Sequence, residues 1–211
     1  MWLSTVQYFV VQVVVASAWK PSYSWRLNSI SDLGATSCGQ FDGRSVCSPW
    51  HGLMNASLVL LGLAMAVGSV LTSQVFGESR ASRVGFSFMA VAGVGAMLVG
   101  FFPENTVFWA HTTGADLAFL LGNIALIVFG LSLRLSRWFS WYSIASGVVA
   151  LVGLYLFLSH HRLFLGLGGV ERVVAYPQTI WLIVFGLYAL TRRSQSVAGH
   201  AQMTKSRRGA S

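Results

Sequence analysis

Charged side chains are scarce in this chain. Of its 211 residues only 9% are Asp, Glu, Lys or Arg, whereas 55% are hydrophobic. A water-soluble globule needs more polar surface than this composition supplies, so the sequence excludes a soluble protein. The apolar residues also do not alternate with polar ones in runs of about ten, as the strands of an outer-membrane barrel do. The chain is therefore expected to be an all-α integral membrane protein.

Six long apolar segments account for most of the chain. Each is about as long as the roughly 17–25 helical residues that cross a bilayer. Backbone groups in lipid must be satisfied within their own segment, which favours continuous helices. This pattern predicts a six-transmembrane-helix bundle in one membrane domain, residues 1–193, followed by a basic, flexible cytoplasmic tail at 194–211. The expected helices lie near residues 2–19, 52–76, 84–102, 108–133, 138–158 and 173–190, with a long outer loop at 20–50.

The basic residues orient this bundle, because short cytoplasmic loops retain Lys and Arg. Nine of the fourteen Lys and Arg lie at residues 75–83, at 134–137 and in the tail from residue 192. Both termini are therefore predicted to be cytoplasmic, in a multi-pass protein of the cell's inner (plasma) membrane. The net charge of +8 then faces the cytoplasm, and we interpret it as a topology signal that meets anionic lipid rather than nucleic acid.

Two cysteines occur, Cys38 and Cys47, and both lie in the loop at 20–50. An oxidising exterior would let them close a small ring, which predicts a structural disulfide. A metal or redox pair is the alternative, but this spacing matches no common site.

Proton-active side chains gather at the predicted extracytoplasmic end. Asp32 is one candidate, although a single turn capped by Asn28 or Ser29 would explain it equally well. Ser48 is expected to cap the second helix. His51 and Asn55 are four residues apart and so share one face of that helix, beginning at the outer interface.

The third and fourth segments add more candidates. Glu104 ends the third segment and His111 begins the fourth. Asp116 and Asn123 are seven residues apart and are expected to stack on one side of a helix. A carboxylate inside the membrane is costly unless it is paired, hydrated or protonated, which makes Asp116 a functional candidate. An interhelical hydrogen bond is its structural alternative.

A glycine-rich stretch before the sixth segment leads to Glu171 and Arg172, followed by Tyr176. Flexible glycines there suggest a backbone that approaches something closely, with a charge pair aimed at a polar group. The alternative is a loop clamp in which Arg172 binds Asp32 or Glu104.

Several strings of residues resemble a known family. They are Asn28 to Gly34, Ser48-Pro49, Gly100 to Asn105 with His111, Phe119 to Asn123, Gly169 to Arg172, Tyr176-Pro177 and Trp181. In order and spacing they are similar to the uncharacterised prokaryotic membrane family known as domain of unknown function 998, from about Tyr23 to Tyr188. The resemblance implies a six-helix integral membrane protein and brings no reaction, substrate or catalytic residue.

The pattern favours an enzyme that hydrolyses or transfers a group of a lipid or polyprenyl-linked substrate at the extracytoplasmic side, because histidine and half-buried carboxylates suit proton transfer near neutral pH. The predicted catalytic residues are Asp32, His51, Glu104, His111 and Asp116. The predicted substrate-binding residues are Asn28, Ser48, Asn55, Asn123, Glu171, Arg172 and Tyr176.

A divalent metal held by His51 and His111 with Asp32 or Glu104 is conceivable, but no ligand spacing supports it, so no metal site is predicted. The alternatives to an enzyme are a non-catalytic lipid or small-molecule binder or transporter, and an assembly partner of a membrane complex.

Overall fold

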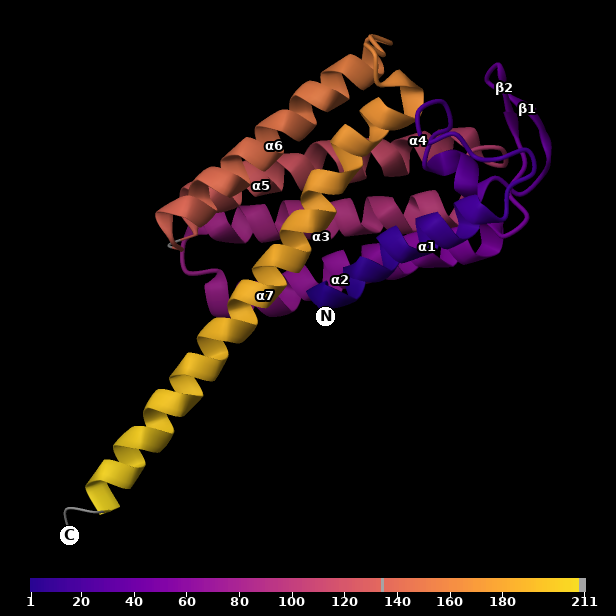
Figure 1. The fold of residues 1–211 in the computed structure, drawn as a ribbon. Helices are drawn as coiled ribbons and strands as arrows, with labels where there is room; N and C mark the ends of the chain where they lie inside the picture. Colours follow the sequence, from indigo (N-terminus) through magenta and orange to yellow (C-terminus); the bar gives the residue numbers. More distant parts are fainter. Residues whose placement is uncertain (134, 209–211) are drawn as a thin grey trace.

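The computed structural model describes residues 1–133 and 135–208, and side chains up to Thr191. The chain forms a bundle of helices with a small β-hairpin at one end (Figure 1). Its elements are η1 (Trp2–Thr5), α1 (Val6–Ser17), η2 (Ser31–Gly34), β1 (Gly39–Phe41), β2 (Arg44–Val46), α2 (His51–Phe76), α3 (Arg80–Phe101), α4 (Phe108–Asp116), η3 (Leu117–Leu121), α5 (Gly122–Ser132), α6 (Arg137–Leu158) and α7 (Gly166–Arg208).

Five helices are long and apolar enough to cross a membrane, and the chain is a multi-pass membrane protein. They are His51–Phe76, Arg80–Phe101, Phe108–Ser132, Arg137–Leu158 and Gly166–Thr191. This confirms the expected all-α membrane fold, and four of the five helices begin and end within a few residues of the predicted positions.

The first apolar helix, Trp2–Ser17, is shorter than the other five. Its 3₁₀ turn and α-helix together rise about 26 Å, against roughly 30 Å for a bilayer core. Its Trp2 indole lies against Gly68, eight residues before the end of α2. The sixth membrane span therefore stays a prediction.

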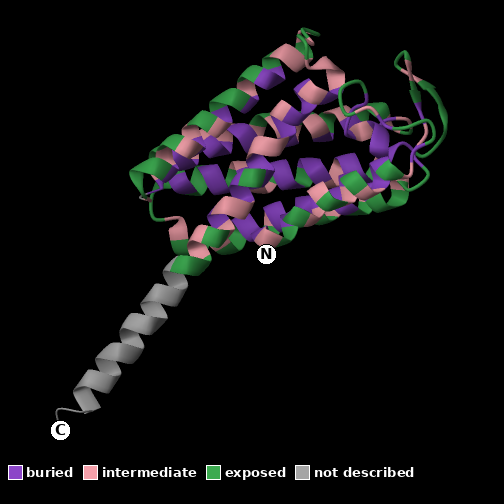
Figure 2. Cartoon of the chain, viewed as in Figure 1, coloured by how far each residue is buried: buried purple, intermediate pink, exposed green. Residues whose placement is uncertain are grey.

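Buried residues line the interior of the bundle and exposed residues lie on its outside (Figure 2). Many of the exposed residues are large and hydrophobic. Exposed aromatic residues collect near the two ends of the helices. Trp109 and Phe164 lie at the end that carries the hairpin, and Trp138 and Trp141 lie at the other. Aromatic belts of this kind are typical of the two interfaces of a membrane protein.

Glycines allow the central helices to approach closely. A Cβ on Gly62 of α2 would lie 2.4 Å from the carbonyl oxygen of Gly93 on α3, and one on Gly93 would lie 2.6 Å from that of Gly62. A Cβ on Gly95 of α3 would lie 2.5 Å from the carbonyl oxygen of Gly114 on α4. Small residues pack membrane helices in this way because lipid provides no hydrophobic force between them. Helix α3 is thereby held between α2 and α4.

Aromatic rings fill the half of the bundle away from the hairpin. The Trp181 ring stacks on Phe129 with 4.9 Å between ring centroids and on Phe185 with 5.0 Å. Trp2 and Phe139 pack against the same cluster. This packed core closes the interior of the bundle at that end.

Helix α7 begins at Gly166, earlier than predicted, so the glycine-rich stretch expected as a loop forms its first turns. The prediction of a loop was wrong because it interpreted the glycines as a sign of a flexible backbone. A Cβ on Gly168 would lie 2.1 Å from the carbonyl oxygen of Asn28, so this glycine serves a close approach. Helix α7 also continues to Arg208 through most of the predicted tail at 194–211, whose side chains lie outside the described part.

Candidate functional site

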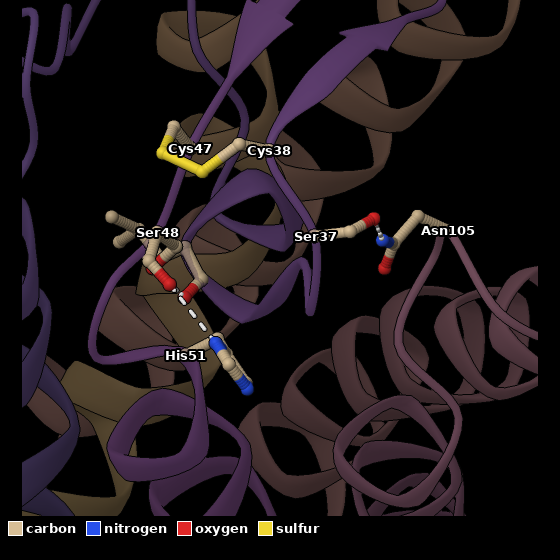
Figure 3. Close-up of a disulfide and its surroundings, with 7 residues drawn as sticks. Ser37, Cys38, Cys47, Ser48, His51 and Asn105 are labelled. Carbon is tan, nitrogen blue, oxygen red and sulfur yellow. Dashed lines mark hydrogen bonds between the residues drawn. A yellow bond between two sulfur atoms is a disulfide. The ribbon is translucent and has the colours of Figure 1, made fainter.

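The segment between α1 and α2 folds over one end of the bundle, here called the loop end (Figure 1). A disulfide between Cys38 and Cys47 closes the base of the β1–β2 hairpin, which confirms the predicted pairing (Figure 3). Asn105, between α3 and α4, donates to the Ser37 hydroxyl at 2.9 Å and accepts from the Thr36 backbone NH at 3.1 Å. The disulfide-closed hairpin is thereby tied to the helices.

Arg44 of the hairpin gathers three carboxylates. Its Nε lies 2.9 Å from Asp32 Oδ2, its Nη1 lies 3.0 Å from Asp42 Oδ2, and its Nη2 lies 3.5 Å from Glu104 Oε2. Asp32 is fully buried and Glu104 nearly so, whereas Asp42 is exposed. The structure therefore brings Asp32 and Glu104 together as expected. The clamp in which Arg172 binds them is wrong, because Arg44 occupies that position.

Asp32 also shapes the loop. It accepts from the Ser29 backbone NH at 2.9 Å, and its own NH donates to the Ser29 hydroxyl at 3.0 Å. This reciprocal pair has the hydrogen bonds of a capping box and closes the turn that leads into η2. Asn28 adds a third hydrogen bond to the Asp32 carboxylate at 3.1 Å. The predicted capping role of Asp32 is confirmed, while its catalytic role stays a prediction.

The two buried carboxyl groups differ in charge. Burial disfavours the charged form of Asp32, but hydrogen bonds from Arg44 outweigh it and hold the pKa of Asp32 below its ordinary value. Burial, followed by the hydrogen bond and the repulsion of Asp32, raises the pKa of Glu104 to about 10. At neutral pH the pair therefore holds one proton, on Glu104, beside the ionised Asp32.

His111, in the first turn of α4, makes a hydrogen bond with a serine of the loop. Its Nε2 lies 2.9 Å from the Ser31 hydroxyl, and its Nδ1 lies 2.9 Å from the Phe102 carbonyl oxygen. A carbonyl oxygen only accepts, so Nδ1 carries the proton and Nε2 accepts from Ser31. His111 is buried and Ser31 is partly exposed. This is the arrangement of a hydroxyl nucleophile beside an oriented base.

Helix α7 holds the loop with its Glu-Arg pair. Glu171 accepts from the Ile30 backbone NH at 2.6 Å. The Arg172 guanidinium donates to the Tyr23 hydroxyl and to three carbonyl oxygens, those of Trp25, Asn28 and Gly168. Its Nε donates to the Tyr176 hydroxyl at 3.2 Å. The predicted binding residues Glu171 and Arg172 thus anchor the loop, and Tyr176 accepts a hydrogen bond from Arg172.

Three predicted residues around the start of α2 serve the same end. Ser48 donates to the Leu33 carbonyl oxygen at 2.6 Å, so its predicted role as a helix cap is wrong. The His51 Nδ1 lies 3.0 Å from the Ser48 carbonyl oxygen (Figure 3). Asn55 donates to the Gly34 carbonyl oxygen at 3.0 Å. Neither the His51 nor the Asn55 side chain makes a hydrogen bond with Ser31 or His111, or with the carboxylates around Arg44.

Asp116 and Asn123 do not share a face. Asp116 is exposed on the outside of the bundle, whereas Asn123 is fully buried and donates to the carbonyl oxygens of Phe119 and Val174. The π-helical segment Leu117–Leu121 lies between them. A π segment adds a residue to the turn, so a spacing of seven no longer returns to the same side. The stacking expected from the sequence is therefore wrong.

A cavity of about 40 Å³ lies inside the bundle next to Ser31. Its polar lining comes from Tyr8, Ser31, Glu171, Gln178 and Thr179, and its walls are apolar residues of α2, α3, α4, η3 and α7. It has room for a few water molecules. Of the predicted site residues, Glu171 lines it, whereas the others mostly bond to the loop. The expected open polar pocket is therefore replaced by a closed, largely bonded cluster.

A larger hollow of about 400 Å³ lies at the opposite end of the bundle. It is lined by Val75, Phe76, Glu78, Ser79, Ser132, Leu133 and Leu135, none of which the sequence suggested. Among the described residues, no three His, Cys, Asp or Glu side chains are arranged to hold a metal ion.

Ser31 and Arg44 were missed from the sequence. Arg44 could have been found, because it is a cation in the same loop as Asp32 and Asp42. Ser31 had no local signal, since its partner His111 is 80 residues away.

The model of one family, described as a protein of unknown function (DUF998), matches residues 4–188. Neither the search of curated proteins nor that of solved structures found a match.

Proposed function

We propose that this chain, which belongs to the DUF998 family of proteins of unknown function, is a membrane enzyme that hydrolyses or transfers a group of a lipid or polyprenyl-linked ester. One observation carries the proposal, namely the hydrogen bond between the Ser31 hydroxyl and His111 Nε2 beside an internal cavity. The coupling of a nucleophile, a base and an orienting group is the common basis of acyl transfer by serine enzymes.

Each residue has a chemical role in this mechanism. Ser31 attacks the ester, and its proton passes to His111 Nε2. The Phe102 carbonyl oxygen holds Nδ1–H and so keeps the imidazole in the tautomer that can accept. His111 then returns the proton to the leaving oxygen, and water or an acceptor alcohol releases the acyl group from Ser31 by the reverse steps. A carbonyl orients the imidazole as a carboxylate would, but stabilises the imidazolium less.

The cavity supports a lipid substrate because its walls are mostly apolar. It extends from Ser31 past Leu58 to Met65 on α2, and the π segment contributes Phe119. π segments occur often at functional sites. At about 40 Å³ the cavity is too small for an acyl chain. Binding of a lipid tail therefore requires the helices around the cavity to move apart.

The proposal includes a topology. The first helix completes six spans, both termini lie in the cytoplasm, and the loop end faces the extracytoplasmic side of the plasma membrane. The basic residues Arg80, Arg83 and Arg137, at the opposite end from the disulfide, support this orientation, since short cytoplasmic loops retain cations and disulfides persist outside the cytoplasm.

The test is turnover by purified protein in detergent. Fluorescent lipid esters and a total lipid extract are incubated with the wild type, Ser31→Ala and His111→Gln. Each substitution is expected to lower kcat by on the order of 10²-fold or more. The matched control is Ser45→Ala, because Ser45 is an exposed serine in the same segment between α1 and α2. A fluorophosphonate probe should label the wild type and not Ser31→Ala. Equal turnover by wild type and Ser31→Ala, with equal melting temperatures, would contradict the mechanism.

A non-catalytic lipid binder is the second candidate. It is favoured by the observation that Asp32, Glu171 and Arg172 are engaged in bonds to the loop. Saturable lipid binding that survives Ser31→Ala, without turnover of any lipid, would select this function. A transport path is disfavoured because stacked aromatic rings fill the other half of the bundle.

A further inference from the structure

The outward face of α4 carries a carboxylate at membrane depth. Trp109, Thr113, Asp116 and Leu120 are all exposed, and their spacing of four, three and four residues places them on one stripe of the helix. Asp116 lies eight residues after Phe108, the first residue of this membrane span, and so about 12 Å along the helix axis. The short Asp side chain cannot extend from there to the headgroups.

Three other polar side chains of the spans turn inward. Asn123 is fully buried, Glu171 binds the backbone of the loop, and Gln178 lines the internal cavity. Ionisable residues in membrane helices almost always face the protein interior, water or a partner, because a charge in lipid is costly. Asp116 departs from this rule in the isolated chain. Its face is therefore expected to be covered in the membrane.

We propose that this face of α4, formed by Trp109, Thr113, Asp116 and Leu120, docks a transmembrane helix of another protein that carries a Lys or Arg in the half of the membrane at the loop end. The basic side chain pairs with the Asp116 carboxylate. Trp109 and Leu120, one to two turns away on either side, supply apolar contact. Charge complementarity favours this partner, because a carboxylate at membrane depth is stabilised by pairing with a cation at the same depth.

A second copy of this chain does not fit. In the described part of the membrane-spanning helices the cations are Arg80, Arg83, Arg137 and Arg172. The first three lie in the first turns of helices that begin at the opposite end, and Arg172 is bonded to the loop. A parallel copy would thus place Asp116 near a second Asp116 and no cation. The Thr113 hydroxyl, which donates to the Trp109 carbonyl oxygen at 2.8 Å, does not replace the missing partner.

The experiment uses the full chain in phosphatidylcholine vesicles together with a labelled leucine-rich transmembrane peptide. One peptide carries a single Lys about eight residues from its end, which matches the depth of Asp116, and the control peptide carries Leu there. Energy transfer between a label on the chain and the peptide reports association. The wild type should bind the Lys peptide on the order of tenfold more tightly than the Leu peptide.

Variants make the result specific to this face. Asp116→Asn should remove the preference for Lys, and Thr113→Phe, which crowds the same stripe, should weaken binding of both peptides. Glu78→Gln is the matched control, because it removes an exposed carboxylate outside the spans and should leave the preference unchanged. Equal binding of the two peptides by the wild type, or an unchanged preference in Asp116→Asn, would overturn the proposal. Energy transfer between labelled copies of the chain that is lost in Asp116→Asn would also overturn it, in favour of self-association.

Discussion

Replacing Glu104 by Gln tests the charge state of the cluster that Arg44 holds together. Burial, then the contact with Asp32, raises the pKa of Glu104 from 4.5 to about 10. Between these two values, Glu104 keeps its proton in the folded protein and loses it in the unfolded chain. Gln has the shape of the protonated carboxyl group and needs no proton. The variant should therefore keep an uncharged side chain beside the ionised Asp32 at every pH.

The direction in which stability changes with pH follows from the raised pKa of Glu104. The contribution of Glu104 to stability is complete below the unfolded value of 4.5 and declines as the pH rises toward the folded value of about 10. Each pH unit in this window costs about 1.4 kcal/mol, so stability should fall by up to about 4 kcal/mol between pH 5 and pH 8. Asp32 has a lowered pKa, so its contribution is present in this window and is lost only on further acidification. Glu104→Gln should therefore match the wild type near pH 5 and exceed it at pH 8.

The assay is thermal unfolding in detergent, followed by circular dichroism from pH 5 to pH 9, with infrared detection of the protonated carboxyl C=O band at neutral pH. The band should be stronger in the wild type than in Glu104→Gln. Asp42→Asn is the matched control, because it removes an exposed carboxylate bound to the same Arg44. A wild-type melting temperature that is flat or rises from pH 5 to pH 8, or a missing carboxyl band, would refute the reasoning.

Three further perturbations test the scaffold. Arg172→Lys keeps the charge but loses several hydrogen-bond donors to the loop. It should lower the free energy of unfolding by about 3 kcal/mol and speed proteolysis between residues 20 and 50. An unchanged cleavage rate would count against the anchoring of the loop by Arg172. The bond between Cys38 and Cys47 should protect both thiols from alkylation until reduction, and Cys47→Ser should cost about 2–3 kcal/mol in melting experiments. Gly93→Ala places a Cβ 2.6 Å from the backbone of α2 and should lower the melting temperature strongly, whereas Gly52→Ala, where nothing lies within 4 Å, should not. Equal effects of the two glycine substitutions would exclude close helix packing as the cause.

The membrane class, the helical bundle and the disulfide could be predicted from the sequence, because they depend on composition and on local runs of residues. The second helix, predicted at 52–76, is observed at His51–Phe76. The sequence also indicated that Asp32 and Glu104 lie at the same end, since alternate ends of successive spans meet on one side of the membrane. That inference needed no knowledge of which side chains touch.

Spacing rules failed where the helix departs from its regular period. The seven residues between Asp116 and Asn123 predict one face in an α-helix, but the π segment Leu117–Leu121 turns them to different sides. The early start of α7 was also missed. Taken alone, Gly168 favours a loop, but in the structure it lies in the helix and allows the close approach of Asn28. The second outcome depends on Asn28, a neighbour that lies far away in the chain.

By itself, the sequence determined that this protein is a helical membrane protein and that five of its six acids and four of its five histidines lie toward one end, because hydrophobic run length and charge placement are properties of each segment. Only the tertiary structure decided that Ser31 meets His111, that Arg44 rather than Arg172 binds the carboxylates, and that Asp116 faces outward. Those pairings join segments up to 80 residues apart, and helix packing, rather than any local pattern, brings their side chains within hydrogen-bonding distance.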